Sequence, residues 1–124
     1  MNGKRPYRMV LMSGEKKPKR GEIYWVDLEP AIGGETKKKR PGLIVSNDIG
    51  NEVSLIVMVA PITSKIKRVH PFEVKTLVNG KPAKIMLNQC KALDKSRLKD
   101  KIDSVDPDTM RNVEEAIKIV FGLT

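Results

Sequence analysis

Residues 37–48, KKKRPGLIVSND, join a cationic run to a proline and a short apolar run. Proline has no backbone N–H, so Pro41 belongs at the start or the edge of a strand. The apolar residues LIV predict that a buried strand continues from it. The polar run NDIGNE that follows predicts a turn. The stretch therefore predicts a core strand entered from an exposed loop, and it leaves open whether one of its four cations has a chemical role.

The segments on either side of this stretch also predict strands. Residues 21–28, GEIYWVDL, are rich in β-branched and aromatic residues. Residues 29–39 contain proline, two glycines and charged residues, and predict a long exposed loop. Residues 54–64, SLIVMVAPITS, form an apolar run long enough for a central strand. Pro61 should interrupt its hydrogen-bond ladder near the end.

The following segment predicts a hairpin. Asn79-Gly80 stands between two strand-like runs, and this pair favours the positive φ angles of a two-residue hairpin turn. Residues 83–90 are expected to form the return strand. Residues 92–98 predict one helical turn with Asp94 as its N-cap, and residues 99–105 predict a short strand.

The C-terminal segment predicts a helix. Asp106 suits the N-cap, Pro107 the first helical position and Gly122 the C-terminal end. Apolar residues recur at spacings of three and four, at Met110, Val113, Ile117 and Val120. With five to seven short strands before it, this helix predicts a mainly β fold, a small and strongly curved antiparallel sheet or partly open barrel closed by a C-terminal helix.

Length and charge indicate one basic domain. The chain has 124 residues, which suits a single domain. Residues 1–19 are expected to form a basic, flexible arm and residues 20–124 the domain. The net charge is +9, of which the first twenty residues carry +6, from seven Lys or Arg and one Glu. This charge suits a polyanionic partner such as nucleic acid. No apolar run approaches the roughly 20 residues of a membrane span, so we expect a cytoplasmic protein without a membrane partner.

The residue inventory argues against several kinds of site. There is no Cys/His cluster for zinc, and no phosphate-binding or dinucleotide-binding glycine motif. The single His70 has no partner in the sequence, and the single Cys90 is expected to be a small buried hydrophobe. Asp27, Glu29 and Glu35 could include a carboxylate pair, although acidic residues near loops are usually solvated. Any catalysis is therefore expected to need neither metal nor other cofactor.

RNA cleavage is a reaction that tolerates such an inventory. The 2′-hydroxyl of RNA supplies the nucleophile, so the protein needs mainly to orient the substrate and to stabilise charge on the phosphorus. The planar guanidinium of arginine suits that second task, and a Ser or Thr hydroxyl can add one donor.

Four motifs give the chain a resemblance to a known family. They are RGEIYWVDLEP at 20–30, RPGLIVSNDIGN at 40–51, VMVAPITSKIK at 57–67 and MLNQCKALDKSRL at 86–98. In this order and spacing the chain resembles the MazF/PemK family of toxin ribonucleases, from about Arg20 to Leu123. The resemblance implies a small SH3-like or CcdB-like antiparallel barrel that assembles as a homodimer. It also implies cleavage of single-stranded RNA, mRNA above all, at a short sequence without metal. The expected products are a 2′,3′-cyclic phosphate and a 5′-hydroxyl, and the expected partner is an antitoxin with an acidic C-terminal segment.

The resemblance also implies the site residues. Arg40 of the RP motif and Thr63 of the ITS motif match the positions that the family associates with catalysis. We expect Arg40 to hold the scissile phosphate and to be a candidate proton donor to the leaving oxygen, and Thr63 to donate to a non-bridging oxygen. No residue is identified as the general base. The expected RNA-binding residues are Lys37, Lys38, Lys39, Ser64, Lys65, Lys67 and Gln89.

Two residues differ from the pattern of the family, and one alternative function stays open. Ser46 stands where many members of the family have glutamine, and Lys91 where many have arginine, so the cut sequence is open. The alternative is a non-catalytic member of the same fold, which binds nucleic acid or inhibits a protein target such as gyrase. Such a protein would bind its target and release no RNA product.

Overall fold

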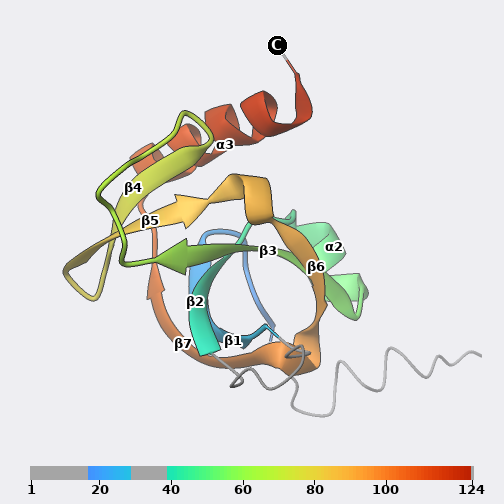
Figure 1. Cartoon of the computed structure of the whole chain (residues 1–124). Helices are drawn as coiled ribbons and strands as arrows, with labels where there is room; N and C mark the ends of the chain where they lie inside the picture. The colour runs from blue at the N-terminus through green and yellow to red at the C-terminus, as the bar shows by residue number, and fades with distance from the viewer. Residues whose placement is uncertain (1–16, 29–38, 124) are drawn as a thin grey trace, which may run out of the picture.

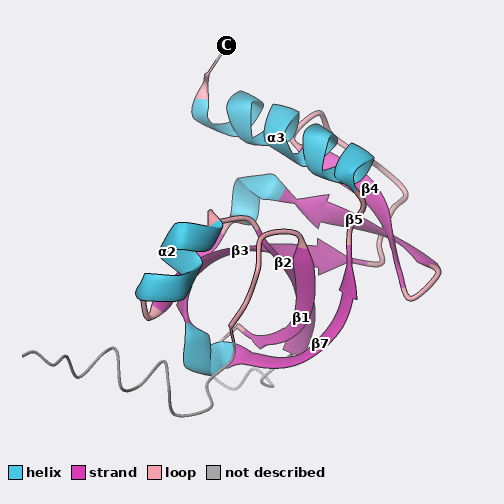
Figure 2. Ribbon diagram, turned by 180° about the vertical axis from the view of Figure 1, so that it is seen from behind, coloured by secondary structure: helices cyan, strands magenta, loops and turns pink. Residues whose placement is uncertain are grey.

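One curled antiparallel sheet with a C-terminal helix forms the described part of the chain (Figures 1 and 2). The computed structural model describes residues 17–28 and 39–123. The strands are β1 (Glu22–Asp27), β2 (Lys39–Ile44), β3 (Ile56–Thr63), β4 (Glu73–Val78), β5 (Lys81–Met86), β6 (Lys91–Asp94) and β7 (Leu98–Ser104). The helices are α2 (Asp48–Val53) and α3 (Pro107–Phe121), with short 3-10 turns η1 (Leu87–Gln89) and η2 (Lys95–Arg97). The expected mainly β fold with a C-terminal helix is confirmed.

The sheet curls because its longest strand changes partners. The sheet order is β4-β5-β3-β2-β1-β7, and β6 also pairs with β3. Val59 of β3 is the last residue that pairs with β6, and Ile62 is the first that pairs with β5. Pro61, which cannot donate to a ladder, lies between these two pairings, as the sequence predicted. Figure 1 shows the resulting ring, in which β3, β2, β1, β7 and β6 surround the interior.

The core has two parts, and β3 contributes to both. Val57 and Val59 pack in one cluster, while Ala60 and Ile62 pack in the other. Burial on both faces explains the continuous apolar run of this strand. The close approach of β2 also explains a glycine, since a Cβ on Gly42 would lie 2.5 Å from Cγ1 of Val59.

The hairpin and the C-terminal helix follow their local signals. Asn79 and Gly80 have φ angles of 51° and 79° and join β4 to β5, as expected for this turn. Asp106 accepts a hydrogen bond from the Thr109 amide at 2.7 Å and caps α3, and Gly122 ends it in the left-handed region at φ 69°. Val113 and Ala116 of α3 are buried in the same cluster as residues of β4 and β5.

Three sequence predictions need correction. Residues 47–52 were expected to form a turn, but α2 begins at Asp48, because Asn47 caps it and the buried Asn51 anchors it. Asn51 Nδ2 donates to the Ser46 carbonyl at 2.9 Å, and Ser46 Oγ bonds to Asn51 Oδ1. The return strand expected over 83–90 is also shorter, because β5 ends at Met86 and η1 follows. The helical turn expected over 92–98 is confirmed only in part: Asp94 caps the short η2, but residues 91–94 before it form β6 and pair with β3.

Other expectations concern residues that the structure does not describe. The proposed arm of residues 1–19 lies outside the described residues except for 17–19, and so does the loop of 29–39 except for Lys39. Within the described part, neither helix is long and apolar enough to cross a bilayer.

Candidate functional site

A groove of about 640 Å³ opens where β2 begins and β3 ends. Its walls come from both ends of the described chain, because β1, β2, β3, the β4–β5 hairpin and β7 all contribute. The lining residues are Trp25, Lys39, Arg40, Pro41, Ile62, Thr63, Ser64, Val78, Asn79, Lys81, Pro82, Ala83 and Ile102. Three of these are cations, and none of the lining residues in the described part of the chain is acidic. The groove is therefore suited to an anion.

Arg40 and Thr63 lie together in this groove. The register of β2 and β3 pairs Gly42 with Pro61, which sets Arg40 and Thr63 at equivalent positions two residues further along the two strands. On its other side Arg40 pairs with Val26 of β1, so its backbone is part of the sheet. Pro41 fixes a backbone angle next to it. The arginine is thus carried by an ordered strand and is half-buried.

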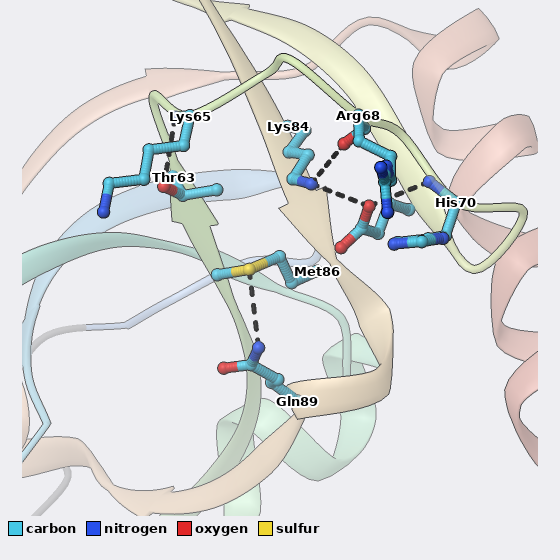
Figure 3. A network of polar contacts seen from close by, with 8 residues as sticks. Thr63, Lys65, Arg68, His70, Lys84, Met86 and Gln89 are labelled. Atoms are coloured by element: carbon cyan, nitrogen blue, oxygen red, sulfur yellow. Dashed lines mark hydrogen bonds and ion pairs between the residues drawn. The ribbon is translucent and has the colours of Figure 1, made fainter.

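The Thr63 hydroxyl is positioned by the start of the following loop. The amide of Lys65 donates to Thr63 Oγ1 at 3.2 Å (Figure 3). A hydroxyl can accept and donate at the same time, so its own hydrogen is left for another acceptor. Arg40 and Thr63 can therefore present a guanidinium fork and a hydroxyl donor to the same ligand.

The other predicted site residues divide into three groups. Lys39 and Ser64 line the groove. Lys65 and Lys67 lie in the loop of residues 64–72, beside the groove but not among its lining residues. Gln89 also lies outside the lining, where its amide donates to Met86 Sδ at 3.5 Å (Figure 3). Lys37 and Lys38 lie outside the described residues, and all these roles stay predictions.

Sequence reasoning missed Trp25, Asn79 and Lys81. Trp25 is 39% exposed, pairs with Pro41 across β1 and β2, and lines the groove. Asn79 and Lys81 reach the groove from the tip of the hairpin, which the Asp103 carboxylate holds by accepting from the Asn79 amide at 2.8 Å. Trp25 could have been noticed as an aromatic residue in a predicted strand. Asn79 and Lys81 could not have been placed in the groove, because the position of the hairpin tip depends on the curl of the sheet.

A buried ion pair lies behind Thr63. Lys84, which pairs with Thr63 across β3 and β5, places its Nζ 2.9 Å from Oε1 of Glu73. The ammonium also donates to the Arg68 carbonyl at 2.5 Å, and the same Glu73 oxygen accepts from the His70 amide at 2.9 Å. Figure 3 shows this network beside Thr63. The pair thus connects the loop of residues 64–72 to two strands.

The remaining candidates have structural surroundings. The ring of His70 stacks on Phe72 with 5.1 Å between the ring centroids. Cys90 is half-buried, and burial raises the pKa of its thiol, which disfavours a nucleophilic thiolate. Asp27 has a buried Oδ1 with no hydrogen-bond partner among the described residues, while Glu29 and Glu35 are outside them. In residues 17–28 and 39–123, no three His, Cys, Asp or Glu side chains gather as a group that could hold a metal ion.

Comparisons with known proteins agree with one another. The sequence model of a family described as "PemK-like, MazF-like toxin of type II toxin-antitoxin system" matches residues 19–121. The chain is 37% identical over 110 residues to endoribonuclease EndoA of Bacillus subtilis (strain 168), covering 85% of this chain and 95% of that protein.

Two solved structures are also similar. One is a MazE–MazF complex from Deinococcus radiodurans, with 26% identity, a TM-score of 0.75 and coverage of 89% of this chain and 100% of that one. The other is a mycobacterial endoribonuclease in complex with its cognate antitoxin, with 28% identity, a TM-score of 0.73 and coverage of 86% and 97%.

Proposed function

Because the chain belongs to the family of PemK-like, MazF-like toxins of type II toxin–antitoxin systems, we propose that it is an endoribonuclease toxin that cleaves single-stranded RNA. The relative from Bacillus subtilis is named an endoribonuclease, and a mycobacterial relative was solved with its cognate antitoxin. An RNA substrate and an antitoxin partner follow for this chain. A toxin of this kind acts on cellular RNA, mRNA above all, in the cytoplasm.

One observation carries the proposal. Arg40 and Thr63 come from different strands and line one groove together with Lys39 and Lys81. Phosphate binding needs such cations, and the lack of acidic lining residues in the described part leaves their charge unopposed there. Trp25 adds an exposed ring on which a base can stack, a contact that single-stranded nucleic acids commonly make with proteins.

The chemistry proposed for this groove is transesterification followed by release. The 2′-oxygen of the RNA forms a bond to phosphorus and loses its proton, while the bond from phosphorus to the 5′-oxygen breaks and that oxygen gains a proton. The products are a 2′,3′-cyclic phosphate and a 5′-hydroxyl. Arg40 and the Thr63 hydroxyl donate to the non-bridging oxygens, where charge develops. Arg40 is also a candidate to protonate the leaving 5′-oxygen. It is a poor candidate for the general base that takes the proton from the 2′-hydroxyl, because arginine stays protonated.

The lysines bind RNA without reading its sequence. Lys39 and Lys81 lie in the groove, and Lys65 and Lys67 extend its cationic rim along the loop of residues 64–72. Each neutralises one phosphate at most, so their contributions should be similar and salt-dependent. Lys37, Lys38, Ser64 and Gln89 complete the proposed set of RNA-binding residues.

The same groove accounts for the expected inhibitor. An acidic C-terminal segment of an antitoxin would compete with RNA for these cations. We also propose a homodimer, which the exposed apolar residues Ile49, Val53, Leu55 and Ile56 on α2 and around the start of β3 support. Sedimentation of the isolated chain at several concentrations tests the dimer.

The experiment is cleavage of a long, defined, unstructured RNA in excess EDTA, followed by mapping of the new 5′ ends. We expect cuts at one short sequence, and loss of cutting in Arg40→Ala and in Thr63→Val. Thr63→Val keeps a β-branched shape and removes the hydroxyl. Arg111→Ala is the matched control, because Arg111 is an exposed arginine on α3 that pairs with Asp108 away from the groove.

Two results would contradict the proposal. Salt-dependent RNA binding without product at any protein concentration would favour the non-catalytic alternative. Undiminished cutting by Arg40→Ala would leave the RNase activity standing but refute this site.

A further inference from the structure

The loop of residues 64–72 carries three cations beside the groove but has few anchors of its own. It joins Thr63, the last residue of β3, to Glu73, the first residue of β4. Its cations are Lys65, Lys67 and Arg68. A segment with so little regular structure can take several conformations unless other parts of the chain fix it.

Glu73 and Lys84 supply those anchors. Their side chains are 7% and 11% exposed, and 2.9 Å separates the ammonium nitrogen from the carboxylate oxygen. Lys84 donates to the carbonyl of Arg68 in the middle of the loop, and Glu73 accepts from the amide of His70 near its end. The pair is therefore bonded to the loop backbone at two separate points.

A gain in folding stability is a weak explanation for the buried ion pair of Glu73 and Lys84. Removing two charges from water is costly, and well-packed apolar residues often stabilise a protein as well as a buried ion pair does. Polar groups with fixed directions do something that apolar residues cannot, because they select one backbone conformation. Here the selected backbone is that of the loop of residues 64–72.

The anchored loop leads back to the Thr63 hydroxyl. Lys84 lies opposite Thr63 in the pairing of β3 and β5, and the Lys65 amide bonds to Thr63 Oγ1 at 3.2 Å. If the loop leaves its anchor at Arg68, Lys65 can move and the hydroxyl is free to rotate. The short run of backbone from Arg68 to Thr63 thus connects the ion pair to the hydroxyl that is proposed to act on RNA.

We propose that Glu73 and Lys84 form a positioning pair that fixes the loop of residues 64–72, and with it the direction of the Thr63 hydroxyl and the place of Lys65 and Lys67. The inference rests on the proposed function, since it assigns these residues a part in RNA cleavage. Neither residue lines the groove or is proposed to touch RNA. They act through the loop.

The main test is the double variant Glu73→Gln/Lys84→Met. It removes both charges together, so no unpaired charge stays buried, and methionine keeps most of the aliphatic stem. Lys101→Met is the control, because it breaks a more exposed pair, that of Lys101 and Glu22 on β7 and β1, with 3.1 Å between nitrogen and oxygen. All variants are compared with the wild type by urea unfolding, so that global stability is known.

Two readouts separate positioning from a merely structural role. The first is tryptic cleavage of the native protein after Lys65, Lys67 and Arg68, which reports opening of the loop without RNA. We expect roughly tenfold faster cleavage there in the double variant, in excess of any change caused by global unfolding. The second is the steady-state RNA assay, in which kcat should fall about tenfold or more because a donor to the transition state is misplaced. KM should rise less, since the lysines proposed to bind RNA all remain.

A charge swap makes the test stricter. Glu73→Lys/Lys84→Glu keeps an ion pair, but a lysine at 73 cannot accept from the His70 amide and a glutamate at 84 cannot donate to the Arg68 carbonyl. If the two hydrogen bonds to the loop matter, the swap is impaired at least as much as the double variant, in which a glutamine at 73 can still accept from the His70 amide. Lys84→Arg, which keeps donors, retains more of kcat. If only the ion pair matters, the swap resembles the wild type and the inference is wrong.

The remaining outcomes are also decisive. Wild-type tryptic cleavage in the double variant refutes the anchoring, and fast loop cleavage with an unchanged kcat refutes the catalytic consequence. A wild-type protein that cuts no RNA refutes the proposed function instead, and the tryptic readout still decides whether the pair fixes the loop.

Discussion

Replacement of Arg40 by lysine should stop most of the chemistry while leaving RNA binding nearly intact. The change keeps one positive charge in the groove, where Lys39 and Lys81 also remain. It removes the planar fork, which can donate to two phosphate oxygens at once. Binding depends on the number of charges, whereas catalysis depends on donors aimed at the developing charge. The two should therefore separate in this variant.

The magnitude follows from the position of Arg40. Its backbone pairs with Val26 and lies two residues from Gly42, which pairs with Pro61, so the main chain should not move to compensate for a lost donor. Loss of one aligned donor to a transition-state oxyanion costs about 2.7–4 kcal/mol. We therefore expect kcat to fall roughly 100-fold to 1,000-fold in Arg40→Lys, with KM changed by less than about threefold.

The assay is single-turnover cleavage of a short fluorescent RNA that contains the mapped cut sequence, in EDTA and at fixed salt. Arg111→Lys on α3 is the matched control, since it makes the same chemical change outside the groove. A fall in affinity with an unchanged single-turnover rate would refute the reasoning, because Arg40 would then be only one more cation. So would a rate within threefold of the wild type.

Three further predictions concern the frame of the site. Gly42→Ala should destabilise the fold by about 1–3 kcal/mol in urea unfolding, since the added Cβ would lie 2.5 Å from Cγ1 of Val59. Gly50→Ala on α2 is the control and should change stability much less, because its added Cβ would come no closer than 3.4 Å to another residue. Burial tends to raise the pKa of Glu73, but hydrogen bonds from the His70 amide and Lys84 outweigh it and lower that pKa below its ordinary 4.5. The stability that the Glu73 carboxylate confers is then present above pH 4.5 and lost as pH falls through the lowered pKa, so urea midpoints should decline in acid, with a weaker decline in Glu73→Gln; equal declines would contradict this. Because burial raises the pKa of Cys90, iodoacetamide should label the native thiol more slowly than the urea-unfolded thiol, and Cys90→Ala should cut RNA at the wild-type rate; fast native labelling or lost activity would contradict it.

The sequence predicted the elements that depend on local chemistry. The Asn79-Gly80 turn needs two positive φ angles, and the capping of α3 by Asp106 needs only neighbouring residues, so both were visible without tertiary information. The central apolar strand was visible because it is buried on both faces. Arg40 and Thr63 were singled out by family resemblance, and the register of β2 and β3 explains how they come to line one groove.

The features that escaped prediction depend on contacts between distant segments. A six-residue helix with an internal glycine looks like a turn, and α2 exists because Asn51 is buried against Ser46. Lys81 and Trp25 meet in the groove only once the sheet has curled. Lys84 lies in the predicted return strand, where nothing local marks a lysine as buried, and its burial against Glu73 appears only when the loop of residues 64–72 folds back over it.

The most direct test of the proposed chemistry uses an RNA with a single 2′-deoxynucleotide immediately 5′ of the mapped cut, which removes the attacking hydroxyl and changes nothing else. Cleavage is followed in EDTA by mass spectrometry of the fragments, with the all-ribose RNA alongside. If the groove of Arg40 and Thr63 promotes attack by the substrate's own 2′-oxygen, the all-ribose RNA yields a 2′,3′-cyclic phosphate and a 5′-hydroxyl, and the substituted RNA stays intact at that position. Cleavage of the substituted RNA at an undiminished rate would mean that water is the nucleophile and would contradict the mechanism.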